Sequence, residues 1–171
     1  MTAQRVSAQS LVRETFATIG SLYVPVLIIS SPGLIMLVVN VFSKLDPLGV
    51  ALYMTYWIWA GSLSSKALIV YTHRRLTGNQ VTVGEAFKQA NTREVQLLFA
   101  NHRELLKGRE SLMMRAIYAL ILIVCVPSFL IVRLIAPMGT PVTALVMGTL
   151  IGFLMGQVIA VYLVLLNLRL R

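Results

Sequence analysis

Side chains that could carry out chemistry are few in this sequence, and their spacing does not bring them together. Catalysis needs a nucleophile beside a base or paired acids, and a metal needs converging His, Cys or carboxylate ligands. The two histidines, His73 and His102, and the single cysteine, Cys125, show no such pattern. The glutamates between the second and third apolar runs are interspersed with Lys and Arg, as on a solvated helix face: Glu85, Glu94, Glu104 and Glu110. We therefore predict a protein that is not an enzyme and that has no cofactor or metal.

A second group of polar residues lies inside apolar stretches, where hydroxyl and amide groups could line a path. These residues are Ser30, Ser31, Ser62, Ser65 and Gln157. The neighbouring aromatic residues Tyr53, Tyr56, Trp57 and Trp59 either form an interfacial belt, pack within the bundle, or meet a lipid, quinone or pigment. The serines either serve the path or bond to carbonyls of their own helix.

Small residues recur every four positions near the C-terminus of the chain. The stripe consists of Ala144, Gly148, Gly152, Gly156 and Ala160. In lipid, where no hydrophobic force drives helices together, small residues allow the close backbone approach that packing requires. The stripe predicts a tight helix–helix seam, either inside the molecule or with another membrane protein or a second copy.

The elements that position these residues are predicted from composition and run length. The chain is 57% hydrophobic and only 12% charged, whereas a soluble domain carries about 25% charged residues. A spanning helix needs about 20 mostly apolar residues, and four stretches qualify: 22–42, 48–71, 112–135 and 141–166. They lack the alternation of membrane strands. The sequence predicts one all-α membrane domain of four transmembrane helices in two antiparallel hairpins.

Charge sets the expected orientation. The chain carries a net charge of +9. If both termini are on the cytoplasmic side, most Lys and Arg residues are also on that side, and Lys44 and Arg133 are on the other. This distribution is typical of membrane proteins, so we expect both termini to be cytoplasmic. Lys66, Arg115 and Arg133 lie near span ends, where long side chains reach the interface. We expect an inner membrane of a bacterium, or a thylakoid of a cyanobacterium, with no nucleic-acid partner. Residues expected to contact lipid headgroups are Arg74, Arg75, Lys88, Arg103, Lys107 and Arg109.

The segment 72–111 is expected to be a cytoplasmic loop with amphipathic helices. Thr77–Gln80 is typical of a turn, and Thr82 with Glu85 fits a capping box. A second helix is expected to begin near Asn91 and end at Gly108. Residues 5–19 predict a further short interfacial helix.

Prolines are expected to bend the spans. Pro25 and Pro32 in the first span, and Pro127 in the third, each remove a ladder hydrogen bond. Neighbouring serines are expected to satisfy the freed carbonyls.

One stretch resembles a known family. Val81–Ala90, after a span that ends in Tyr71–Arg75, is similar to a pattern in uncharacterised bacterial polytopic proteins related to the membrane domain associated with glycerophosphodiester phosphodiesterases. The resemblance implies that a span ends in basic residues and that a turn then opens a cytoplasmic helix. It covers roughly a tenth of the chain and implies no catalytic residue.

Three functions fit these observations. The first is a non-enzymatic subunit, assembly factor or membrane-organising scaffold that acts through the small-residue stripe and the basic loop, with membrane lipids and another membrane protein or a second copy as partners. The second is a component of a transporter or channel. The third is a lipid-, quinone- or pigment-associated subunit.

Overall fold

The computed structural model describes residues 7–42, 47–92, 95, 110–135 and 141–170, and these form an all-α protein. The described helices are α1 (Ala8–Ser21), α2 (Tyr23–Phe42), α3 (Pro47–Leu76), α4 (Val83–Gln89), α6 (Glu110–Ile135) and α7 (Pro141–Leu170). Each of the four predicted spans coincides with one long helix, and α3 and α7 extend beyond the predicted C-terminal limits.

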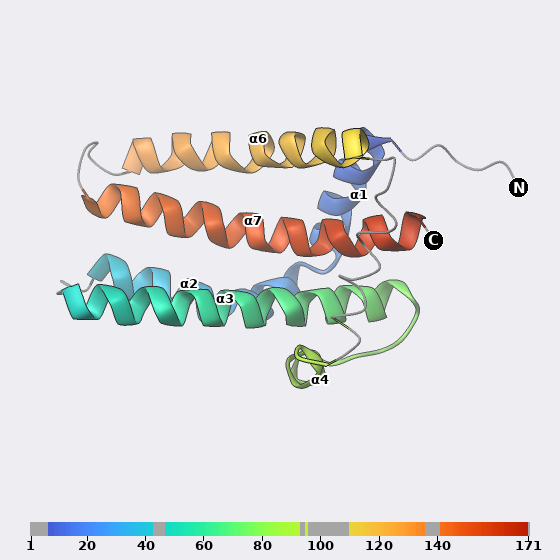
Figure 1. The fold of residues 1–171 in the computed structure, drawn as a ribbon, viewed down its shortest axis with the longest axis horizontal. Helices are drawn as coiled ribbons and strands as arrows, with labels where there is room; N and C mark the ends of the chain where they lie inside the picture. The colour runs from blue at the N-terminus through green and yellow to red at the C-terminus, as the bar shows by residue number, and fades with distance from the viewer. Residues whose placement is uncertain (1–6, 43–46, 93–94, 96–109, 136–140, 171) are drawn as a thin grey trace, which may run out of the picture.

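The helix α7 lies at the centre of the arrangement. It packs against α1, α2, α3 and α6, whereas the described part of α6 packs only against α1 and α7. In Figure 1, α7 lies between α6 on one side and the α2–α3 pair on the other, and the four long helices run side by side. A helix that is surrounded in this way needs apolar residues on all faces, which the sequence of α7 supplies.

One end of the bundle is packed more completely than the other. We call the end that holds α1, α4 and the last turns of α3 and α7 the base, and the end where α2 finishes and α3 begins the tip (Figure 1). At the base, six consecutive residues of α3, positions 67–72, are buried, because α4 and α7 enclose the helix there. Toward the tip, α3 exposes large apolar side chains such as Leu52 and Ile58.

The chain turns sharply between α1 and α2. The two helices are bent by 84°, and Leu22 at the junction has φ −107° and ψ 21°. Pro25 lacks an N–H for the carbonyl of Ser21, and its ring crowds that carbonyl, so a continuous helix is disfavoured. The predicted bend at Pro25 is therefore present, but it lies at the junction of α1 and α2, and Pro25 itself is in the first turn of α2.

The second proline of α2 is accommodated without a break. Pro32 cannot donate to the carbonyl of Ile28, but the Ser31 hydroxyl donates to that carbonyl at 2.8 Å. The expectation that a neighbouring serine satisfies the freed group is confirmed here.

The predicted N-terminal amphipathic helix corresponds to α1. Its Leu11, Thr15 and Thr18 are buried, and Phe16 packs with Leu11 against Tyr162 of α7 and residues of α6. Thr15 fits among apolar residues because its hydroxyl donates to the Leu11 carbonyl at 2.8 Å. The apolar face of α1 is therefore covered by protein.

The predicted turn and capping box after α3 are confirmed. Gly78 has φ +83°, a left-handed conformation that glycine adopts readily, and it closes the end of α3. In α4, the Glu85 N–H donates to Thr82 Oγ1 at 3.3 Å, and the Thr82 N–H donates to Glu85 Oε2 at 2.8 Å. The predicted helix from Asn91 to Gly108 lies mostly outside the described residues.

Two helical segments are long and apolar enough to cross a membrane, by length and composition: Ser111–Ile131 and Leu150–Arg169. A third is present if the bent pair Ala8–Ser21 and Tyr23–Pro32 is one span. The part of the chain that the structure describes thus gives two to three candidate membrane spans.

Candidate functional site: a cavity among three helices

A cavity of about 280 Å³ lies where α2, α3 and α7 meet, about halfway along α3 and α7. Of the α2 side chains that the structure describes, Ser30 is the one that lines the cavity. The lining residues of α3 are Ile58, Gly61, Ser62, Ser64, Ser65 and Leu68, and those of α7 are Gly152, Phe153, Gly156 and Gln157. The lining therefore combines hydroxyl and amide groups with apolar side chains.

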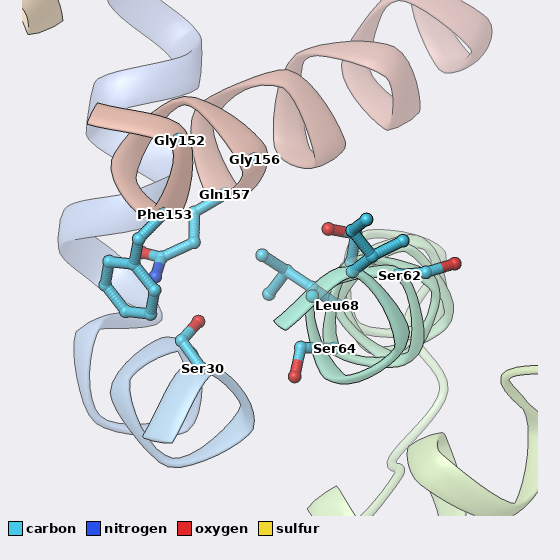
Figure 2. Close-up of a pocket in the computed structure, with 11 residues that line it drawn as sticks. Ser30, Ser62, Ser64, Leu68, Gly152, Phe153, Gly156 and Gln157 are labelled. Atoms are coloured by element: carbon cyan, nitrogen blue, oxygen red, sulfur yellow. The ribbon is translucent and has the colours of Figure 1, made fainter. Parts of the chain in front are cut away.

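The side chains approach the cavity from several helices. Figure 2 shows the Ser30 hydroxyl pointing from α2 toward Phe153 and Gln157, while Leu68 extends from α3 into the space between the helices. Gly152 and Gly156 face the same space with no side chain of their own (Figure 2). A molecule in the cavity would contact all three helices at once.

Two polar atoms of the lining are buried without a hydrogen-bond partner in the protein: the Ser64 hydroxyl and the side-chain amide nitrogen of Gln157. Burying such a group without a partner costs roughly 1–3 kcal/mol. Other serines in the chain avoid this cost, as when Ser128 donates to the Val124 carbonyl at 2.7 Å. The unpaired groups therefore mark this cavity as a place where a hydrogen-bonding molecule would gain energy.

The glycines of α7 explain why the space is open. The small-residue stripe begins in the first turn of α7 with Ala144. Ala160 is buried, and a methyl group at Gly156 would lie 3.5 Å from Ser65 Oγ, in ordinary contact. Gly152 lines the cavity, and Gly148 has open space around it. Within the described part of the stripe, Ala160 is buried near the base whereas Gly148 is exposed, and the predicted role of the stripe as a partner interface stays a prediction.

The structure places most of the polar residues that were predicted to line a path around the same cavity. Ser30, Ser62, Ser65 and Gln157 all line the cavity. Ser31 is not among the lining residues, and its hydroxyl donates to the Ile28 carbonyl. Sequence reasoning missed Ser64 and Phe153 as lining residues. Ser64 could have been found from its spacing in the sequence, because Gly61, Ser64 or Ser65, and Leu68 recur at helical spacing and so lie on one face of α3.

The aromatic residues of α3 have a different environment. Trp59 is 62% exposed and its ring centroid lies 6.0 Å from that of Tyr56, which is also exposed. Neither lines the central cavity. Tyr53 and Trp57 lie on α3, and their side chains are outside the described part of the structure.

The cations predicted to contact headgroups lie at the base where they are described. Arg74 and Arg75 are in the last turn of α3, and Lys88 is in the last turn of α4. Arg103, Lys107 and Arg109 lie outside the described residues. Lys66, placed by sequence near a span end, donates from Nζ to Asn91 Oδ1 at 3.1 Å.

His73 is half-buried near the end of α3, His102 is outside the described residues, and Cys125 is a half-buried free thiol in α6. Among the described residues, no three His, Cys, Asp or Glu side chains lie close enough together to hold a metal ion.

Fold and cavity together define an α-helical protein with two to three candidate membrane spans and a partly polar space between its helices. Comparison with protein-family models, curated proteins and solved structures gives no match to this chain. The resemblance of residues 71–90 to the phosphodiesterase-associated membrane domain therefore stays a prediction.

Proposed function

We propose that this chain is a non-enzymatic integral membrane protein of four spans that binds a small uncharged molecule between α2, α3 and α7, as a component of a transporter or channel. The observation that carries the proposal is the pair of unpartnered polar atoms, Ser64 Oγ and Gln157 Nε2, at the wall of the cavity. The described lining residues include no charged side chain, which favours an uncharged ligand because a buried ion requires a counter-charge.

Helix length supports the four-span arrangement. The 20 residues of α2 rise about 30 Å, which matches the hydrocarbon core of a bilayer. The helix α3 is 30 residues long and so about 45 Å. Its first two thirds are long enough to cross, and its last third, enclosed by α4 and α7, would then lie at the cytoplasmic surface.

The proposed topology is tested with one introduced cysteine, because the chain has a single native cysteine that can be removed. In a Cys125→Ser background, a cysteine is introduced at Thr77, in the turn after α3, and labelled in intact cells with a membrane-impermeant maleimide. We expect labelling only after the cells are opened. Labelling of intact cells would contradict a cytoplasmic base.

The transport proposal is tested in proteoliposomes with glycerol as the probe, by stopped-flow light scattering. We expect the wild-type protein to raise glycerol permeability above that of empty liposomes. Gln157→Leu, which keeps the bulk and removes the amide, and Ser64→Ala are expected to lower it.

Ser128→Ala is the matched control, because Ser128 is a buried serine outside the cavity whose hydroxyl is satisfied within α6. A wild-type permeability equal to that of empty liposomes, or an equal loss in Ser128→Ala and Gln157→Leu, would reject the proposal.

A second candidate function is that of a subunit or scaffold, and one observation favours it. Gly148 belongs to the small-residue stripe but faces open space, so this part of α7 is accessible to a helix of another protein or of a second copy. Gly148→Leu is expected to remove a co-purifying membrane protein, detected by mass spectrometry after nanodisc purification, without unfolding the chain. Unchanged co-purification and oligomer size would argue against it.

A further inference from the structure

A second hollow, of about 380 Å³, lies on α3 beside the segment that follows α4. Its lining residues are Thr55, Ile58, Trp59, Ser62, Leu63, Lys66 and Asn91. Ile58 and Ser62 also line the central cavity, so the two spaces lie on either side of a ridge on α3.

Among the lining residues that the structure describes, Lys66 is the one cation, and it lies at one end of the hollow. The Lys66 ammonium donates to Asn91 Oδ1 at 3.1 Å, which holds it between α3 and the end of α4. An ammonium has three N–H donors, so this contact leaves two for another acceptor. No carboxylate is among the described residues that line the hollow. Within the described lining, the Lys66 ammonium therefore has an amide oxygen but no carboxylate as a partner, and it can bind an anion there.

The other end of the hollow is apolar and open. Ile58 is 64% exposed and Trp59 is 62% exposed, and both lie two turns from Lys66 toward the tip. Thr55 adds little polarity, because its hydroxyl donates to the Ala51 carbonyl at 2.9 Å. A ligand that fits has an anionic end at Lys66 and an apolar portion along Ile58 and Trp59.

Depth in the membrane agrees with such a ligand. Lys66 lies 19 positions after Pro47, where α3 begins, which corresponds to a rise of about 28 Å. If α3 begins at one boundary of a hydrocarbon core of about 30 Å, Lys66 lies at the other boundary. That boundary is where lipid phosphate groups are found, with acyl chains directed toward the tip.

We propose that this hollow binds one phosphate-bearing anionic lipid of the cytoplasmic leaflet, with its headgroup on Lys66 Nζ and its acyl chain along Ile58 and Trp59. The site differs from general attraction to basic loops, because one ammonium fixed by Asn91 selects the position of the phosphate. The proposal is independent of what the central cavity binds.

The test is native mass spectrometry of the full chain from nanodiscs that contain equal amounts of phosphatidylglycerol and phosphatidylcholine. We expect one retained phosphatidylglycerol on the wild-type protein. Lys66→Gln is expected to reduce its retention about fivefold, as for the loss of one cation at a membrane surface. Lys66→Arg, which keeps the charge, is expected to retain it.

Lys88→Gln is the matched control, since Lys88 is an exposed cation of α4 that does not line the hollow. Helix content by circular dichroism establishes that each variant is folded. Equal retention of phosphatidylcholine, unchanged retention in Lys66→Gln, or an equal loss in Lys88→Gln would overturn the proposal.

Discussion

Arg169 and Glu14 form a two-contact ion pair that joins the last turn of α7 to α1. Arg169 Nε donates to Glu14 Oε2 and a terminal guanidinium nitrogen donates to Glu14 Oε1, both at 3.0 Å. The pair links residues 155 positions apart in the sequence. It holds α1 across the base, where its apolar face covers α6 and α7.

We expect this ion pair to contribute modestly to stability. The Arg169 and Glu14 side chains are 51% and 35% exposed, and exposed pairs are worth about 0.2–1 kcal/mol. A double-mutant cycle with Glu14→Gln and Arg169→Gln, followed by denaturation in detergent, should give a coupling energy in that range that falls with added salt. A coupling energy above 2 kcal/mol at high salt would contradict this account.

Substitution by leucine is expected to affect stability differently at two glycines of α7. At Gly156 it would meet Ser65, whose hydroxyl lies 3.5 Å from a methyl group built there, and overpacking should cost about 1–3 kcal/mol. At Gly148 it would meet open space and should leave the melting temperature of the isolated chain unchanged. Thermal denaturation of both variants checks the difference, and equal destabilisation would show that Gly148 is packed.

Substitutions of Ser31 and Pro32 should have non-additive effects on the free energy of unfolding. Ser31→Ala leaves the Ile28 carbonyl without its donor, and the loss should be about 0.6 kcal/mol, typical of hydrogen bonds inside membranes. In Ser31→Ala/Pro32→Ala, the new N–H of residue 32 can donate to the same carbonyl, so the loss should disappear. Steric trapping or denaturant unfolding in detergent measures both variants, and additive effects would argue against the compensation.

The N-terminal end of α4 should become less stable at acidic pH. Hydrogen bonds from the Thr82 N–H and hydroxyl hold the pKa of the exposed Glu85 carboxyl below its ordinary value of 4.5. A carboxyl whose pKa is lower in the folded state contributes stability that is fully present above pH 4.5 and is lost as the pH falls through the lowered value. Amide hydrogen exchange in α4, corrected for intrinsic rates, should therefore accelerate below pH 4.5 in the wild type but not in Glu85→Gln.

The long helices were predictable because run length and charge determine them. The apolar runs placed α2, α3, α6 and α7, and Thr82 with Glu85 placed α4. The position of the sharp turn, at Leu22, was missed, since Pro25 by itself does not distinguish a kink inside a helix from the start of a new one. That α7 lies at the centre depends on contacts with four other helices, which no local pattern contains.

The candidate site was predictable only in its residue types. Ser30, Ser62, Ser65 and Gln157 were expected to face a common path, and they line one cavity. The space itself was not predictable, because the stripe in α7 suggested close contact throughout. Whether a glycine allows a helix to approach or leaves a gap depends on the residue opposite, such as Ser65 at Gly156.

The central position of α7 has a consequence for biosynthesis. Since the ribosome makes the chain from its N-terminus, α1, α2, α3 and α6 are all produced before the helix on which they pack. Until α7 is made, the described part of α6 has only α1 to contact, α1 lacks its main partner, and α3 lacks one of its two main partners. The bundle around α7 can therefore assemble only after α7 has been made, and until then the faces of the other four helices that α7 covers lack that cover.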